Sequence, residues 1–354
     1  MIEEKIGESP FMKYFRILAP DIAIDMGSAN TLVARIDKGI ILREPTVVAL
    51  DLDKKEVITV GQAAKDLIGK SPDNVIAIRP LRDGVISDFE LTQALLEYYI
   101  RKASPGISMV APRVAISIPS GATDVEQRAL QDAVLQSGSR DVILIEEPVA
   151  SAYGARLIDP DRPSQAALIV DLGAGTAESA IVTGYGVITS ELLMKGGEDL
   201  DNRIKNRLKE SYNLIIGDNT AENIKNGIAS FRKEKQTTAM EVGGRDALSG
   251  MPRSVDIYAS DLYEDLVAYA GDLIDTIRRT VEKTPPEVAS DVISRGIHLT
   301  GGLALLDGIG DYLQETLLMP VHISKTPSED AIQGSLIIMK KLDKDLKGKK
   351  NDSI

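Results

Sequence analysis

The sequence contains no cysteine, no tryptophan, four phenylalanines and two histidines. Without cysteine, neither disulfides nor thiolate metal sites can form. His298 and His322 are too few for a histidine-rich metal site. No run of about 18 apolar residues occurs, so we expect no transmembrane helix. The opening Met-Ile-Glu-Glu-Lys lacks the hydrophobic region of a signal peptide, and we therefore expect a cytoplasmic protein.

Positive charge is also in deficit, because the formal net charge is −12. This balance argues against general binding of nucleic acid by the body of the protein. A chain of 354 residues with 43% hydrophobic and 27% charged residues is typical of a globular protein with two or more cores.

Two short stretches share one design. Residues 21–31 read Asp-Ile-Ala-Ile-Asp-Met-Gly-Ser-Ala-Asn-Thr, and residues 168–176 read Leu-Ile-Val-Asp-Leu-Gly-Ala-Gly-Thr. In each, an apolar run typical of a buried strand ends in an aspartate, Asp25 or Asp171, followed by glycine and small or hydroxylic residues. A single Asp-x-Gly would indicate only a hairpin turn. Two copies, each followed by a further apolar strand, favour a shared function.

The chemistry of these stretches suits phosphate binding. Glycine permits a tight turn whose backbone N–H groups can approach an anion closely. Ser28, Thr31 and Thr176 add hydroxyl donors. Two such loops facing each other would clamp a polyphosphate, and the two aspartates would hold a hydrated Mg²⁺.

The pattern of strands and helices predicts two similar α/β domains. We expect domain I over residues 21–158, with an inserted subdomain at about 47–82 and helices over 88–103 and 124–137. The polar, proline-containing stretch 159–164 is the expected boundary. The stretch 168–190 repeats the design of 22–42.

Domain II is expected over residues 159–335, with an inserted subdomain at about 197–262 and a long helix over 259–283. Within the insertion, Gly243-Gly-Arg-Asp is expected to be a turn. Residues 336–354 hold the end of the closing helix and a lysine-rich tail, Lys340–Lys350, which we expect to be solvated.

Two apolar segments are candidates for membrane contact. The N-terminal segment 1–20 carries Phe11 and Phe15 among Lys13 and Arg16, which fits either a tail packed on the first domain or a short amphipathic anchor. Ile107, Met109 and Val110 lie in a loop bracketed by Pro105-Gly106 and Pro112, and they are hard to explain as core.

Seven motifs together resemble the bacterial actin family MreB, within the actin/Hsp70/sugar-kinase superfamily. They are Gly27-Ser-Ala-Asn-Thr-Leu, Glu44-Pro-Thr-Val-Val-Ala, Ile78-Arg-Pro-Leu-Arg-Asp-Gly-Val-Ile86, Ile118-Pro-Ser-Gly121, Ile145-Glu-Glu-Pro148, Lys283-Thr-Pro-Pro-Glu287 and Leu299-Thr-Gly-Gly302. The resemblance covers residues 21 to about 340.

This resemblance implies an α/β actin-like fold. Each of its two domains has a mixed sheet flanked by helices and a smaller inserted subdomain, and the nucleotide binds in the cleft between the domains. It implies ATP or ADP and Mg²⁺ as ligands, with Asp25 and Asp171 holding the metal through water. Glu147 and Thr176 would orient the attacking water; a carboxylate facing the helix dipole is the alternative role for Glu147. The nucleotide-binding residues implied are Gly27, Ser28, Ala29, Asn30, Thr31, Gly173, Ala174, Gly175, Thr176, Gly197, Glu198, Asp199, Lys225, Gly301, Gly302 and Leu303.

Four departures from the family pattern are visible. Leu303 stands where a third glycine is usual, Ala177 where a second threonine is usual, and Gly227 where a glutamate usually reaches the ribose. The stretch 328–334 also differs from the usual apolar-Ala-x-Gly. These changes predict a divergent member with weaker nucleotide affinity.

The leading hypothesis is an ATP-hydrolysing filament protein at the inner face of the cell membrane, governing cell shape or shape-driven motility. Its partners would be other copies of itself, the membrane and membrane-bound shape-determining proteins, with no nucleic acid. The alternatives are a filament that binds nucleotide with little or no hydrolysis, an Hsp70-like chaperone ATPase, and a sugar or acetate kinase. A chaperone needs a separate peptide-binding domain, and a kinase needs another carboxylate base, for which the sequence offers no clear candidate.

Overall fold

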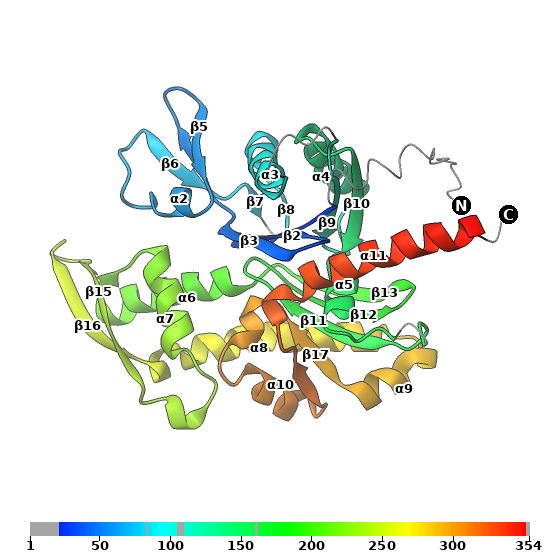
Figure 1. The fold of residues 1–354 in the computed structure, drawn as a ribbon. Helices are drawn as coiled ribbons and strands as arrows, with labels where there is room; N and C mark the ends of the chain where they lie inside the picture. Colours follow the sequence, from blue (N-terminus) through cyan, green and yellow to red (C-terminus); the bar gives the residue numbers. More distant parts are fainter. Residues whose placement is uncertain (1–20, 83, 105–109, 160–161, 352–354) are drawn as a thin grey trace. The chain divides into compact units, whose positions relative to one another are not determined.

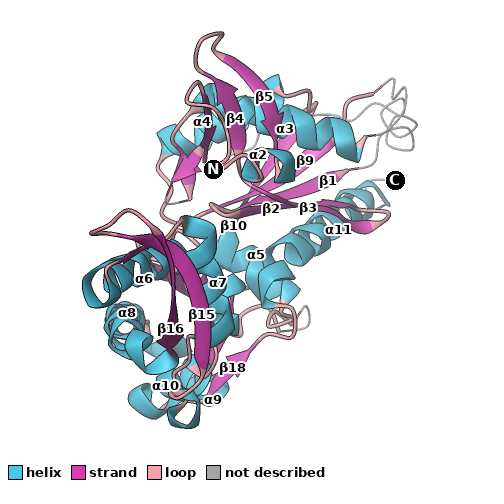
Figure 2. Ribbon diagram, turned by 90° about the vertical axis from the view of Figure 1, so that its left-hand side faces the viewer, coloured by secondary structure: helices cyan, strands magenta, loops and turns pink. Residues whose placement is uncertain are grey.

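The computed structural model describes residues 21–82, 84–104, 110–159 and 162–351. Contacts divide the chain into two compact units. Unit 1 comprises the chain up to Ile118, Ala122–Ile145 and the part from Ile332 onward, and unit 2 comprises Pro119–Gly121 and Glu146–Ala331. Figures 1 and 2 show the elements of both units.

Unit 1 is built on a five-stranded sheet of order β10-β9-β1-β2-β3. Strands β1 (Ile22–Met26), β2 (Asn30–Arg35) and β3 (Gly39–Pro45) form an antiparallel meander, and β9 (Arg113–Ile118) pairs parallel to β1. Strand β10 spans Asp141–Glu146. The apolar runs are buried, as Ile24, Val33 and Ile116 illustrate, because strands covered on both faces need continuous apolar residues.

Helices α3 (Phe89–Ala103) and α4 (Asp124–Gln136) complete the core of unit 1. Leu91, Leu95, Leu96 and Tyr99 are buried on one face of α3, whose first turn is capped by Asp88. A small sheet of order β5-β4-β6, with β4 at Val48–Asp51, β5 at Glu56–Val60 and β6 at Val75–Ile78, carries the short helix α2 (Gln62–Lys65). Strands β7 (Leu81–Arg82) and β8 (Val85–Ile86) form a further pair.

Unit 2 repeats the plan of unit 1. Strands β11 (Ala167–Leu172), β12 (Ala177–Thr183) and β13 (Gly186–Leu193) form an antiparallel meander. Strand β17 (Ile297–Thr300) pairs parallel to β11, and β18 (Val321–Ile323) pairs parallel to β17. In both units the first strand of the meander therefore lies beside a later parallel strand, and the predicted internal repeat is confirmed.

The sheet of unit 2 has helices on both faces. On one face, Ser151 of α5 (Glu147–Gly154) contacts Asp171; on the other, α8 (Ala259–Glu282) packs on β12 and β13. The remaining helices are α6 (Gly197–Tyr212), α7 (Asp218–Ile228), α9 (Pro286–Arg295) and α10 (Ile309–Leu317). A smaller sheet joins β14 (Leu214–Ile215), β15 (Ala239–Asp246) and β16 (Pro252–Tyr258).

One local prediction is wrong. The turn expected at Gly243–Asp246 is the second half of β15, and a side chain at Gly244 would lie 2.7 Å from the carbonyl oxygen of Ile215, so this glycine admits a close approach of β14. The lysine-rich stretch from Lys340 extends helix α11 (Asp330–Asn351), which begins in unit 2 and continues in unit 1 from Ile332, and its described lysines Lys340, Lys341 and Lys344 are exposed, as expected.

Contacts also place α5 in unit 2, although the expected boundary at residue 158 would have left it in the first domain. No helix among the described residues is both long and apolar enough to cross a membrane.

Candidate functional site

Asp25 is the fourth residue of β1 and is held from the neighbouring strand. Its carboxylate accepts a hydrogen bond of 2.8 Å from the hydroxyl of Ser117 on β9. Burial raises the pKa of the Asp25 carboxyl, and the Ser117 bond acts in the opposite direction. A cation beside this carboxylate would favour its ionised form, which fits the expected metal role.

The loop after Asp25 is braced by buried hydroxyls. The N–H of Gly27 donates to the carbonyl of Asn30 (3.1 Å), and the hydroxyl of Thr46 donates to the carbonyl of Gly27 (2.6 Å). The Thr31 hydroxyl lies 2.9 Å from that of Thr46 and is fully buried. The single hydroxyl proton of Thr46 is donated to Gly27, so Thr46 must accept from Thr31. The Thr31 hydroxyl, which was predicted to bind an anion, therefore supports the loop. Ala29 belongs to the same loop, and its carbonyl accepts from the N–H of Thr46.

Asp171 and its loop reproduce this geometry in unit 2. The N–H of Gly173 donates to the carbonyl of Thr176 (2.9 Å), the same four-residue closure as from Gly27 to Asn30 in the first loop. Asp171 accepts a hydrogen bond of 3.0 Å from Ser151, here on helix α5 rather than on a strand. A Cβ added at Gly27 or Gly173 would lie 3.0 or 2.9 Å from the carbonyl that closes its loop. The glycines are therefore required by the closure itself.

The second loop rests on the start of α6. The N–H groups of Gly197 and Glu198 donate to the carbonyls of Gly173 (3.1 Å) and Ala174 (2.8 Å). Two of the residues predicted to bind nucleotide thus hold the second loop in place. Asp199, also predicted, pairs with Arg203 at 2.7 Å.

Lys225 was predicted as a nucleotide ligand. In the structure its side chain is buried, and its ammonium group contacts other protein groups. Its ammonium donates to the carbonyl of Gly197 (2.9 Å) and to Asp201 (2.9 Å). Burial raises the pKa of Asp201, and Lys225 partly offsets that rise. Lys225 therefore ties α7 to the start of α6.

A cavity of about 600 Å³ opens in unit 2 beside Lys225. Its walls are the end of α7 and the following strand-like segment on one side and the turn after β17 on the other. The lining residues are Lys225, Asn226, Gly227, Ile228, Ala229, Ser230, Lys235, Thr238, Gly302, Leu303, Leu305, Leu306 and Asp307. A volume of this size suits a small-molecule ligand.

The sequence did not reveal the polar wall of this cavity. Asp307 accepts hydrogen bonds from Ser230 and from Lys235 (3.1 Å). Burial alone would raise the pKa of Asp307, but these donors lower it below its usual range. Ser230 and Asp307 are 77 residues apart, so no local pattern could have joined them.

The turn after β17 lies against the metal candidate of unit 2. Gly301 has φ +81°, and a Cβ there would lie 2.5 Å from the Asp171 carboxylate, so the position requires glycine. Leu303, where the family has glycine, is 8% exposed and packs in the core while lining the cavity. At Gly227, a Cβ would lie 2.3 Å from the methyl group of Met240, so Met240 occupies the space beside this glycine.

The two residues expected to orient water both belong to unit 2. Glu147 is the first residue of α5 and is half-buried, with Pro148 next to it. Thr176 is the last residue of the second loop, which begins at Gly173. Ala177, in place of the usual second threonine, is fully buried and brings no hydroxyl.

Glu178 is a buried carboxylate that sequence reasoning missed. It is the strand partner of Asp171, so both side chains project from the same face of the sheet. The Ser120 hydroxyl donates to Glu178 and lies 2.7 Å from the hydroxyl of Ser190. Burial raises the pKa of Glu178 to about 7. The alternation of side chains along β12 could have predicted that Glu178 lies beside Asp171. It could not have predicted that Glu178 is buried.

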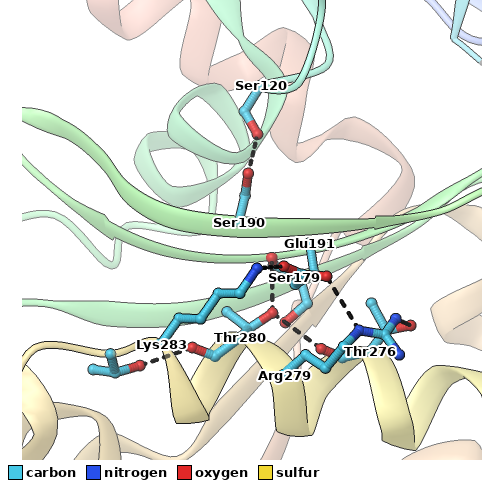
Figure 3. Close-up of polar contacts among 9 residues, drawn as sticks. Ser120, Ser179, Ser190, Glu191, Thr276, Arg279, Thr280 and Lys283 are labelled. Atoms are coloured by element: carbon cyan, nitrogen blue, oxygen red, sulfur yellow. Dashed lines mark hydrogen bonds and ion pairs between the residues drawn. The ribbon is translucent and has the colours of Figure 1, made fainter.

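Figure 3 shows the two faces of this sheet. Ser120 and Ser190 lie on one side, and on the other Glu191 of β13 pairs with Arg279 of α8 (3.1 Å) and with Lys283, which directly follows α8. Thr280 of α8 donates to the carbonyl of Ser179 (3.2 Å). The α8 side is thus fixed by ion pairs, whereas the side that bears Asp171 and Glu178 carries the candidate chemistry.

Among the described residues, no three His, Asp or Glu side chains are grouped so as to hold a metal ion. Mg²⁺ commonly keeps several waters and uses one or two carboxylates together with phosphate oxygens. The donor set of one aspartate per loop fits that mode of binding.

A second region, in unit 1, concerns the membrane candidates. Phe11, Phe15, Ile107 and Met109 lie outside the described residues, and Val110 is half-buried. The buried Arg113 pairs with Asp21 (2.5 Å), directly after the N-terminal segment, and with Asp343 of α11 (2.9 Å). Arg113 itself follows the loop that holds residues 107–110. Asp21, Arg113 and Asp343 therefore form one ion-pair cluster, and each lies next to or within one of three segments: the N-terminal segment, the 107–110 loop and the lysine-rich end of α11.

Comparison with known proteins gives one consistent family. The family model described as MreB/Mbl protein matches residues 19–347. The cell shape-determining protein Mbl of Bacillus subtilis (strain 168) is 38% identical over 328 residues, covering 93% of this chain and 98% of that protein. The cell shape-determining protein MreB of Escherichia coli (strain K12) is 38% identical over 322 residues, covering 89% and 92%.

Solved structures agree with this result. The crystal structure of MreB5 of Spiroplasma citri bound to AMPPNP has a TM-score of 0.87 at 31% identity and covers 93% of this chain and 98% of that one. The ADP-bound form matches equally well. A MamK double helical filament, with a TM-score of 0.76 at 22% identity over 90% of this chain and 99% of that one, shows the same fold.

Proposed function

The chain belongs to the MreB/Mbl family of bacterial actin homologues, and from that premise we propose that it binds and hydrolyses ATP and assembles into filaments at the inner face of the cytoplasmic membrane. The filaments would act in determining cell shape or shape-driven motility, together with membrane-bound shape-determining proteins. The observation that carries the proposal is the repeated loop: an aspartate fixed by a serine, followed by a glycine whose N–H closes a four-residue turn.

Each half of the repeat supplies one loop and one carboxylate to the nucleotide. Backbone N–H groups and Ser28 would bind phosphate oxygens, and Asp25 and Asp171 would hold Mg²⁺ through its waters. When bound, Mg²⁺ neutralises charge on the phosphates. The cavity beside Leu303 accepts the base and sugar, since its volume of about 600 Å³ is within the usual range for such ligands.

Glu147 and Thr176 position the attacking water. Phosphoryl transfer depends mainly on positioning and electrostatics, so a carboxylate that accepts a hydrogen bond from water suffices. Serine anchors on Asp25 and Asp171 keep the two carboxylates oriented. The reaction releases ADP and phosphate.

One alternative has a specific observation in its favour. Ala177 offers no second hydroxyl, and Gly227 offers no carboxylate to the ribose. The ammonium group of Lys225 donates to Asp201. A filament that binds nucleotide with slow or no hydrolysis would fit these features. Relatives bound to AMPPNP and to ADP support nucleotide binding in either case.

The proposed membrane association is supported by the cluster around Arg113. In sequence, Asp21 directly follows the N-terminal segment, Arg113 follows the loop with Ile107, Met109 and Val110, and Asp343 lies within the lysine-rich end of α11. Segments that share one attachment region can contact one flat surface together.

The decisive experiment uses the full chain with ATP and Mg²⁺. Nucleotide affinity by calorimetry, phosphate release and electron microscopy are measured with and without anionic liposomes. We expect binding, phosphate release and filaments that align on liposomes. Binding and filaments without phosphate release would favour the alternative, and an absence of nucleotide binding would overturn both.

A further inference from the structure

Asp330 is a fully buried carboxyl at the junction of three elements of unit 2. It is the first residue of α11 and directly follows the short helix η3 (Pro327–Glu329). One carboxyl oxygen lies 2.9 Å from the hydroxyl of Thr300, the last residue of β17, and the other lies 3.2 Å from the hydroxyl of Thr326. On the α5 side, a Cβ at Gly154 would lie 1.9 Å from the backbone oxygen of Asp330.

These contacts fix the turn that borders the cavity. Thr300 immediately precedes Gly301, whose N–H donates to the carbonyl of Pro327 (2.8 Å). The Thr300 hydroxyl lies 2.9 Å from that same carbonyl. Asp330, Pro327 and Thr300 therefore set where Gly302 and Leu303 stand on the cavity wall.

The surroundings of Asp330 disfavour a negative charge. Among the described residues, no Lys, Arg or His forms an ion pair with it. The titratable residues on the elements packed around it are Glu329 on η3, Lys325 in the preceding loop, His298 on β17, and Glu147 and Tyr153 on α5. Of these, Glu329 acts on its carboxyl and further opposes ionisation. A buried carboxylate without a cation is strongly destabilised.

The hydroxyl of Thr300 points to the same protonation state. It carries one proton but has two acceptors at 2.9 Å, Asp330 and the carbonyl of Pro327. A neutral Asp330 satisfies both contacts, because its O–H donates to Thr300 and Thr300 donates to Pro327.

We propose that Asp330 is held neutral and acts as a positioning residue, fixing the Thr300–Leu303 turn for nucleotide binding. This inference rests on the proposed nucleotide function. Burial raises the pKa of the Asp330 carboxyl, in agreement with the neutral form; hydrogen bonds from Ser324, Thr300 and Thr326 act in the opposite direction and only partly offset the rise. Asp330 also lies in the stretch 328–334, where the sequence departs from the family pattern.

The test compares Asp330→Asn, Asp330→Ala and Thr300→Val, with Glu329→Gln as the matched control that removes a neighbouring carboxylate. ADP affinity is measured by calorimetry with Mg²⁺ from about pH 5 to pH 9, the range in which a raised carboxyl pKa shows itself. Asparagine can still donate to Thr300, so Asp330→Asn should bind ADP within about twofold of wild type. Asp330→Ala and Thr300→Val should each bind about fivefold more weakly, the effect of one lost hydrogen bond.

The pH profile separates positioning from simple packing. The native state favours the protonated carboxyl, so wild type should lose affinity as pH rises through its pKa, whereas Asp330→Asn should not. Asp330→Asn as weak as Asp330→Ala, or parallel pH profiles for wild type and Asp330→Asn, would overturn the inference.

A second measurement keeps the inference separate from the proposed function. Without nucleotide, the unfolding midpoint of wild type should fall as pH rises, relative to the midpoints of two variants. These are Asp330→Asn and the double variant Asp330→Asn/Thr300→Val. If wild type bound no ADP, the proposed function would fail, and the positioning role with it. If wild type bound ADP but its unfolding midpoints changed with pH in parallel with those of Asp330→Asn, the claim that Asp330 is neutral would be wrong, and the proposed nucleotide function would stand.

Discussion

At the scale of single residues, the candidate chemistry depends on side chains held by partners far away in the sequence. Asp25 is oriented by Ser117, and Asp171 by Ser151. A carboxylate in a fixed rotamer loses little freedom when it accepts a hydrogen bond from metal-bound water, so these serines favour binding through preorganisation. The same logic applies to Thr31, whose buried hydroxyl braces the first loop through Thr46.

Replacing Asp25 or Asp171 with alanine should reduce Mg²⁺-dependent phosphate release by about 10- to 100-fold or more, the usual effect of losing a residue that orients metal-bound water. Phosphate release at a series of Mg²⁺ concentrations measures this. Asp37→Asn, in the exposed turn after β2, is the control and should behave as wild type. Wild-type turnover in either alanine variant would show that the paired-aspartate interpretation is wrong.

Glu147→Gln and Thr176→Val should each lower the rate of phosphate release by about 10²- to 10⁴-fold while leaving the Kd for ATP nearly unchanged. A residue that positions water acts in the transition state rather than in ground-state binding. Calorimetry and single-turnover kinetics measure the two quantities separately. Glu146→Gln, one residue before, is the control. Loss of binding with normal turnover per bound site would contradict the assignment.

At the scale of elements, helix α5 connects most of the candidate residues of unit 2. It begins at Glu147, contacts Asp171 through Ser151 and meets the start of α11 at Gly154. The last contact is backbone against backbone, because Gly154 has no Cβ to separate the two helices. The position of Glu147 therefore depends on a glycine seven residues away.

Gly154→Ala should destabilise the protein by about 1–3 kcal/mol, the usual cost of overpacking, since its Cβ would lie 1.9 Å from the Asp330 carbonyl. Phosphate release should fall as well, because α5 must shift. Gly271→Ala in α8 is a matched control: no atom lies within 4 Å of its Cβ, so it should stabilise by about 0.5–1 kcal/mol. Thermal unfolding measures both. Equal unfolding midpoints for the two variants would refute the close-contact argument.

At the scale of the whole molecule, the question is how a chain with a net charge of −12 would reach a membrane. Burying three or four apolar side chains per monomer would gain only a few kcal/mol before ordering costs. A filament repeats the contact along its length, and avidity then makes the attachment firm. The basic residues Lys13, Arg16 and the lysines of the 340–350 segment would add attraction to anionic lipid.

Membrane binding should therefore depend on polymerisation. Met109→Ser/Val110→Ser, or deletion of residues 1–18, should reduce co-sedimentation with liposomes while sparing ATP hydrolysis. Val125→Ser, at a residue of α4 that is 76% exposed, is the control for loss of a surface apolar group. If the double serine variant and the deletion, alone and combined, pelleted as wild type does, the apolar anchor would be excluded and the basic segment would remain.

The sequence by itself determined the features that depend on neighbouring residues. The two Asp-Gly loops, the buried faces of α3 and α8, and the repeat of the two meanders follow from apolar runs, helical spacing and glycine at tight turns. These patterns are local, since a strand or helix buries side chains at a fixed period. The same reasoning failed at Gly243–Asp246, where two glycines suggested a turn and the approach of β14 required a strand.

Only the tertiary structure decided which distant groups meet. Lys225 proved to be tied to Asp201, Ser230 to Asp307, and Asp330 to Thr300. It also decided that Glu178 is buried beside Asp171. The partners of a buried polar group are chosen by how strands and helices pack, and each such group must find one because leaving it unsatisfied costs about 1–3 kcal/mol. In these three pairs the partners are 24 to 77 positions apart, a separation that no period along the chain records.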